Sequence, residues 1–155
     1  MQKIAAKLVA GMAITAIGMF GADSSIGTWK FDPAKATSTA TNKLKSRTDV
    51  YEAAPDGGIK VKRTELRADG TTYNASYTCK YDGKPCPVTG GQFDTISIKR
   101  IDANTISYDA AKTGGKYHFT GTSVISKDGK TLTQNSKGSD ATGKTVVVTY
   151  IFDKQ

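Results

Sequence analysis

The chain has 155 residues and a formal net charge of +8, a length that predicts one domain able to bury a core without several covalent staples. Its only histidine is His118, and two cysteine thiolates alone do not complete a tetrahedral zinc site. We therefore expect neither a metal nor a cofactor. Lysine and arginine are dispersed along the sequence, which favours a soluble surface over a dedicated polyanion-binding block.

Residues 1–22 predict a secretory signal peptide. Two lysines precede an uncharged run of 13 residues at positions 8–20, and small residues follow up to Ala22. A membrane-spanning helix needs about 20 apolar residues, so a permanent anchor is the weaker interpretation. Cleavage after Ala22 leaves residues 23–155 with 20 basic and 14 acidic side chains, a net charge of +6. We expect this domain in a periplasm or outside the cell.

The remaining sequence predicts a single all-β domain. Asp-Gly pairs begin at positions 56, 69, 82 and 128 and mark tight turns, because glycine accepts the positive φ that such turns require. Apolar and polar residues alternate between the turns, as in half-buried strands. About ten strands are expected, at residues 26–31, 46–53, 58–67, 71–81, 84–88, 94–101, 105–112, 116–126, 130–136 and 144–153. Residues 33–43 predict a loop or short lid.

Short connections imply that consecutive strands pair, so we expect an antiparallel up-and-down meander of 8–10 strands. A meander of this size either exposes two long edges or closes into a barrel. Closure removes the edges and leaves an interior that can hold one small ligand.

Side-chain alternation sets the expected strand registers, because a slip of one residue reverses every side chain. At Asp69-Gly70 a three-residue loop places Val61 opposite Tyr77 and Ile59 opposite Cys79. A two-residue loop would instead place lysines opposite Tyr77 and Cys79. The alternation therefore selects the three-residue loop.

The two cysteines predict a cross-strand disulfide. A two-residue loop at Asp82-Gly83 places Cys79 directly opposite Cys86, at a Cα separation that a disulfide can span, in a compartment that favours oxidation. Pro85 and Pro87 flank Cys86, and neither can donate a backbone hydrogen bond. If their bare side faces away from the Cys79 strand, pairing of 84–88 with 94–101 is impaired. We therefore predict a gap near Gly90-Gly91 that could serve as a ligand portal.

Propagating the alternation gathers apolar residues on one face, the predicted barrel interior: Ile59, Val61, Ala75, Tyr77, Ile96, Ile98, Tyr108, Ala110, Phe119, Ile125, Val146, Val148, Tyr150 and Phe152. Arg63, Glu65, Tyr73 and Arg100 share this face. A charge in a lumen is costly unless it is paired or hydrated. These four residues therefore form an internal ion pair, line a wet cavity, or lie at the barrel mouth and reach water.

In the cavity interpretation, Arg100 or Arg63 holds the anionic head group of a ligand. The hydroxyls of Tyr73, Tyr77 and Tyr108 then hydrogen-bond beside it. These five side chains are the candidate binding site.

Catalytic and nucleic-acid-binding patterns are harder to assemble from the sequence. His118 falls on the outer face and lacks an adjacent nucleophile motif, so it is expected to be a surface histidine. The Gly-Gly pairs lie between strands and open no helix that could cradle phosphate. The aromatic residues mostly share the buried face, which argues against stacking with nucleic-acid bases. We expect a non-enzymatic protein.

Two resemblances bear on function. Gly27-Thr28-Trp29 resembles the opening strand of the lipocalin and fatty-acid-binding protein superfamily, where the tryptophan closes the barrel against a basic residue of the last strand. That resemblance implies a role for Lys144 or Lys154 and the binding of a hydrophobic ligand. The strings at 80–84, 87–90, 99–105 and 126–133 resemble an uncharacterised family of small secreted bacterial proteins, which implies no catalytic role.

The sequence leaves two functional hypotheses open. The first is an extracytoplasmic carrier of a small apolar or amphiphilic molecule in the lumen, and it predicts a cavity of about 300 Å³ or more. The second is an interaction module with a filled barrel, whose basic surface contacts a protein or an anionic envelope polymer. A solid core would favour the second hypothesis.

Overall fold

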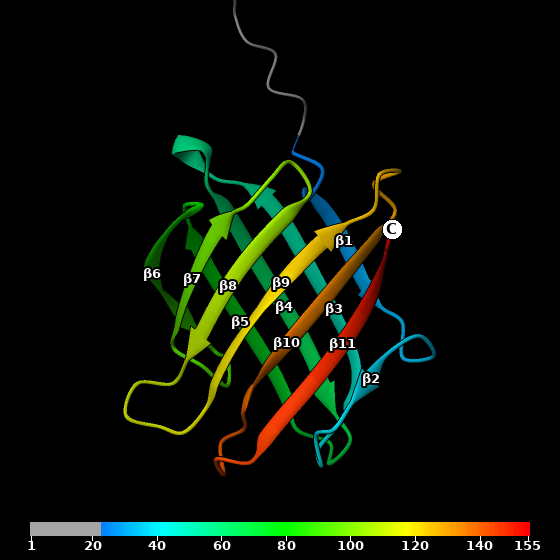
Figure 1. Ribbon diagram of the computed structural model, residues 1–155, viewed down its shortest axis with the longest axis vertical. Helices are drawn as coiled ribbons and strands as arrows, with labels where there is room; N and C mark the ends of the chain where they lie inside the picture. Colours follow the sequence, from blue (N-terminus) through cyan, green and yellow to red (C-terminus); the bar gives the residue numbers. More distant parts are fainter. Residues whose placement is uncertain (1–22) are drawn as a thin grey trace, which may run out of the picture.

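Ten antiparallel strands follow one another around a closed barrel in chain order (Figure 1). The computed structural model describes residues 23–155, so the predicted signal peptide and the bond after Ala22 lie outside the described residues. The barrel strands are β1 (Gly27–Phe31), β3 (Leu44–Ala53), β4 (Ile59–Arg67), β5 (Thr72–Cys79), β6 (Asp82–Thr89), β7 (Thr95–Arg100), β8 (Thr105–Ala111), β9 (His118–Ile125), β10 (Thr131–Ser139) and β11 (Thr145–Lys154). The predicted all-β meander and its closure are confirmed.

The barrel closes between its first and last strands, where Trp29 pairs with Lys154 and Phe31 with Phe152. β1 has five residues and β11 has ten, so β1 cannot cover the whole of β11. A two-residue strand, β2 (Thr37–Ser38), continues the pairing along β11 within the segment that we predicted to be a loop. β2 therefore satisfies backbone groups of β11 that β1 does not reach.

The registers predicted from side-chain alternation are confirmed at the turn between β4 and β5. Val61 pairs with Tyr77, and Ile59 pairs with Cys79. Gly70 has φ +87°, and its amide donates to the Arg67 carbonyl at 3.0 Å, which forms the three-residue loop. The interior apolar face is confirmed as well, because its predicted members lie in the core or pack against it.

The predicted disulfide is confirmed, with Cys79 and Cys86 bonded at a Cα separation of 5.7 Å. The predicted gap between β6 and β7 is wrong. β6 pairs with β7 at Pro85, Cys86 and Pro87. The amide of Val88 donates to Asp94 beside β7, so the missing N–H groups of the two prolines face β5 instead.

The interrupted seam therefore lies between β5 and β6. Their ladder consists of two pairs, Ser76 with Thr89 and Tyr77 with Val88. The disulfide joins the two strands beyond those pairs, on the side of the Asp82-Gly83 turn. Gly90 does not border a portal, since a Cβ there would lie 2.0 Å from the Asn74 carbonyl oxygen of β5.

Residues 23–155 contain no α-helix, and their single helical turn is the 3₁₀ segment Pro55–Gly57. No helix in this part of the chain is long and apolar enough to cross a membrane. The fold thus positions a functional site in one of two places, the lumen or the outer surface.

Candidate functional site in the barrel lumen

A cavity of about 160 Å³ lies inside the barrel. Its lining extends from Ser25 and Tyr81 at one end to Asn42 and Asp140 at the other. We call these the Trp29 end and the Asn42 end. The volume falls short of the roughly 300 Å³ that the carrier hypothesis predicts, but the barrel is not solid either.

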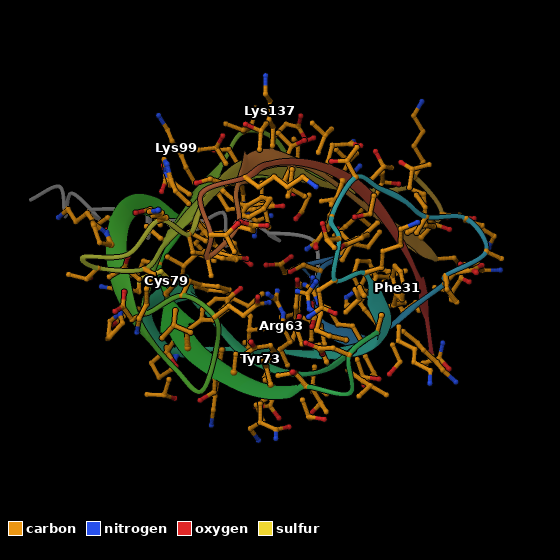
Figure 2. All side chains as sticks on the ribbon, turned by 90° about the horizontal axis from the view of Figure 1, so that it is seen from below. Phe31, Arg63, Tyr73, Cys79, Lys99 and Lys137 are labelled. Carbon is orange, nitrogen blue, oxygen red and sulfur yellow. A yellow bond between two sulfur atoms is a disulfide. The ribbon has the colours of Figure 1, made fainter. Side chains whose placement is uncertain are left out.

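Figure 2 looks along the barrel from the Asn42 end. Arg63 points into the lumen, whereas Lys99 and Lys137 point outward into solvent. The ring of Phe93 lies 5.9 Å from the Arg63 guanidinium carbon. The inner wall thus contains both aromatic and charged groups, whereas these lysines project from the outer surface.

The Trp29 end is covered by the segment that precedes β1. The Trp29 side chain is fully buried, and its Nε1 donates to the Ser25 carbonyl at 2.8 Å. Lys154 Nζ lies 5.1 Å from the centroid of the indole ring. Of the two basic residues that the lipocalin resemblance suggested, Lys154 therefore covers the tryptophan, and Lys144 bonds to Thr41 at 3.1 Å.

Arg100 also belongs to this closure. Its Nη2 contacts Asp23 Oδ2 at 2.6 Å, and its guanidinium lies 4.0 Å from the Tyr81 ring centroid. Burial raises the pKa of Tyr81 to about 12, so its hydroxyl stays protonated and donates to Asp23 at 3.0 Å. Within residues 23–155, neither Arg100 nor Tyr73 lines the cavity, whereas Arg63, Tyr77 and Tyr108 do. The structure thus brings together three of the five candidate residues.

A buried ion cluster forms the β3 and β4 wall. Asp49, on β3, is fully buried and lies directly opposite Arg63 of β4. Its Oδ1 accepts from Arg47 Nε at 2.9 Å and from Arg63 Nε at 3.0 Å, and its Oδ2 accepts from the Nη2 of both arginines. One carboxylate therefore serves two guanidinium groups.

The ionisation of Asp49 follows from this arrangement. Burial by itself would raise the pKa of the Asp49 carboxyl, because it disfavours the charged form. The charges of Arg47 and Arg63 and their hydrogen bonds outweigh burial and lower that pKa to about 2. The Asp49 carboxylate is thus ionised throughout the physiological range.

A second ion pair lies toward the Asn42 end. Arg67 Nη2 donates to Glu65 Oε1 at 2.9 Å, and Gln92 Nε2 donates to the same oxygen at 2.9 Å. Burial opposes the ionisation of Glu65, but Arg67 and the other lumen arginines outweigh it and lower the pKa of the carboxyl. The charges of Glu65 and Arg67 therefore neutralise each other.

The ion pairs of the β3 and β4 wall consequently carry one positive charge in excess. Three arginines on β3 and β4 face two carboxylates, Asp49 and Glu65. The carboxylate of Asp140, at the rim, accepts hydrogen bonds from the amides of Thr142 and Lys144 in its own loop, and within residues 23–155 no ion pair joins it to these three arginines. A buried guanidinium without its own counter-charge is costly. An anion in the cavity would remove that cost.

The opposite wall is polar without being charged. Gln134, on β10, is buried, and its Nε2 donates to Ser123 Oγ of β9 at 3.2 Å. Beside them, Tyr108 of β8 lies over Gly121, where a Cβ would approach the tyrosine hydroxyl to 2.9 Å and the Asn135 carbonyl oxygen to 2.2 Å. Glycine at this position thus makes room for the Tyr108 hydroxyl.

Sequence reasoning missed Arg47, Asp49, Arg67 and Gln134. A signal existed for the first two, because Arg47, Asp49 and Tyr51 alternate with outward residues in a predicted strand. Carrying the alternation across the turn at Asp56-Gly57 would have placed Asp49 opposite Arg63. The interior face predicted from the sequence begins at β4 and therefore does not include these residues of β3.

The exposed ion pairs of the outer face include His118 with Asp109. His118 Nε2 lies 3.1 Å from both carboxylate oxygens of Asp109, and both side chains are more than half exposed. The outward position predicted for His118 is confirmed. Within residues 23–155, no three histidine, cysteine, aspartate or glutamate side chains are grouped as a metal site.

Comparison with known proteins supports the fold and does not define a family. No protein-family model matches the sequence, and no curated protein matches it. Among solved structures, the chain is similar to EF1p2_mFAP2b bound to DFHBI, with a TM-score of 0.51 and 10% sequence identity. The alignment covers 85% of this chain and 94% of that chain. At this identity the likeness concerns the barrel fold alone.

Proposed function

We propose that the protein is an extracytoplasmic binding or carrier protein that holds a small amphiphilic anion in its lumen and does not transform it. The observation that carries this proposal is the excess guanidinium charge beside the cavity. Arg47 and Arg63 share a single carboxylate in a wall that is largely shielded from water. An anionic ligand group supplies the counter-charge, while the apolar lumen accepts the rest of the molecule.

The fold and the disulfide support the same proposal. A barrel of this fold, EF1p2_mFAP2b, is bound to DFHBI, so the architecture is compatible with a small-molecule ligand. The Cys79–Cys86 disulfide suits an oxidising compartment. N-terminal sequencing of the exported protein tests the location, and a mature chain that begins at Asp23 is expected.

Native mass spectrometry of protein purified from its own producing cells tests the binding proposal. The expected result is a co-purified small anion that is lost when Arg63 is replaced by Gln. Lys137→Gln is the matched control, because it removes an exposed positive charge of the outer face. If no ligand co-purifies and no small anion raises the Tm of the wild-type protein, the proposal is wrong.

A further inference from the structure

The size of the cavity restricts the ligand. The cavity has a volume of about 160 Å³. An apolar cavity of about 150 Å³ is known to bind benzene. The lumen is therefore comparable in size to a cavity that holds one ring, which favours a ring with small substituents over a long acyl chain.

The walls around this volume are rich in aromatic rings. The lining aromatic side chains are Tyr51, Tyr77, Tyr81, Phe93, Tyr108, Tyr117, Phe119 and Tyr150. Tyr117 packs against Phe93 at a centroid distance of 5.9 Å and against Phe119 at 4.9 Å, so these rings are ordered by one another. Fixed aromatic rings favour a flat aromatic guest, which they contact by offset stacking and by edge-to-face packing.

The polar groups lie at two separate positions around the ring of strands. Arg63 is on β4 and Ser123 is on β9, and five strand-to-strand steps separate β4 from β9 in either direction around the barrel. Among residues 23–155, the hydrogen bonds of Gln134 use its amide nitrogen, which donates to Ser123 Oγ. The Ser123 hydroxyl and the Gln134 carbonyl can then serve a neutral hydrogen-bonding group opposite the arginines.

We infer that the ligand is a single-ring aromatic acid with a hydroxyl on the far side of the ring, of the hydroxybenzoate class. This inference rests on the proposed function and specifies its ligand class. The carboxylate pairs with the excess charge of Arg47 and Arg63. The ring fills the aromatic lumen, and the hydroxyl bonds to the Ser123 and Gln134 wall.

Isothermal titration calorimetry with 4-hydroxybenzoate, benzoate, phenol, octanoate and palmitate tests the inference. We expect 4-hydroxybenzoate to bind tightest and benzoate about tenfold more weakly, because benzoate leaves the polar wall unbonded. Phenol lacks the anion and is expected to bind more weakly still. Palmitate exceeds the cavity and is expected not to bind.

Two variants assign the two ends of the ligand. Ser123→Ala is expected to remove the advantage of 4-hydroxybenzoate over benzoate and to leave benzoate affinity unchanged. Arg63→Gln is expected to weaken both acids by about tenfold or more and to leave phenol unchanged. Arg63→Lys keeps the charge and provides a second test if the glutamine variant does not fold. Lys99→Gln, on the outer face, is the matched control and is expected to behave as wild type.

The outcomes separate this inference from the proposed function. Octanoate or palmitate binding more tightly than 4-hydroxybenzoate overturns the aromatic-acid inference and leaves a lumen that binds anions. Tight binding of phenol that Arg63→Gln does not alter overturns the assignment of the arginines. Binding of none of the five compounds, together with no co-purified anion, overturns both.

Discussion

Replacing Asp49 by Asn tests the buried ion cluster directly. The substitution keeps the size of the side chain and removes the carboxylate that pairs with both Arg47 and Arg63. Removing one partner of a buried ion pair costs about 3–5 kcal/mol, because the remaining charge stays buried without compensation. The substitution leaves two guanidinium groups without their carboxylate, so we expect a loss of unfolding free energy in the upper part of that range. A loss of this size is a large share of the 5–15 kcal/mol typical of a domain.

Urea unfolding followed by tryptophan fluorescence provides the measurement, since Trp29 is the only tryptophan and is fully buried. Asp109→Asn is the matched control, because Asp109 pairs with His118 on the exposed face and such pairs contribute about 0–1 kcal/mol. The double variant Asp49→Asn/Arg63→Gln removes one stranded guanidinium and should recover part of the loss. Equal, small losses in Asp49→Asn and Asp109→Asn would refute the reasoning.

The pH dependence of the same variant has a defined sign. The pKa of Asp49 is lowered from 3.8 to about 2 in the folded protein. A lowered pKa contributes stability that is present above the unfolded value and is lost as the pH falls through the folded value. Between pH 5 and pH 2, the difference in unfolding free energy between wild type and Asp49→Asn should therefore shrink by on the order of 2 kcal/mol. A difference that stays constant over this range would contradict the assigned ionisation.

Three further predictions concern the rest of the barrel. Reduction of Cys79–Cys86 should lower the unfolding free energy by about 2 kcal/mol and leave the domain folded by circular dichroism, because the loop is short; complete unfolding on reduction would show a weaker core. Gly121→Val should destabilise by about 1–3 kcal/mol or more in thermal unfolding, since its Cβ meets backbone and the Tyr108 hydroxyl, and an unchanged Tm would show that the wall yields. Arg100→Leu should leave 4-hydroxybenzoate affinity within about threefold of wild type while lowering the Tm; a larger loss in calorimetry would place Arg100 in the site.

Local rules predicted most of the fold. Alternation between Asp-Gly turns located all ten barrel strands, and it selected the loop that pairs Val61 with Tyr77. These features depend on residues close together in the chain. β2 was not predicted, because a strand of two residues is too short to show an alternating pattern. It forms because β1 is shorter than β11 and leaves part of β11 without a partner strand.

The sequence did not determine whether the side of β6 that lacks the N–H groups of Pro85 and Pro87 faces β5 or β7. Backbone N–H groups alternate between the two neighbouring strands, and only the pairing of β6 with both neighbours decides which side is bare. The connection from β6 to β7 is too irregular for alternation to be carried across it. The disulfide could be predicted because its two cysteines flank a single tight turn.

The sequence predicted only three of the five candidate binding residues correctly, again because side-chain alternation is a local pattern. Arg63, Tyr77 and Tyr108 lie in strands whose alternation was followed, and they line the cavity. Arg100 shares the inward face but lies where β7 ends, so the segment before β1 reaches it and supplies Asp23 as its partner. Closure of a barrel end by a distant segment leaves no trace in local sequence periodicity.

The weak seam between β5 and β6 has a consequence for producing the protein. In a reducing cytosol, the two ladder pairs at Ser76 and Tyr77 would be the only main-chain ladder between these strands within the described barrel. Strand edges with free backbone groups recruit other chains and lead to aggregation. Recombinant material should therefore be made in an oxidising host compartment, and soluble yield from a reducing strain should rise when Pro85 and Pro87 are replaced by residues that can donate to β5.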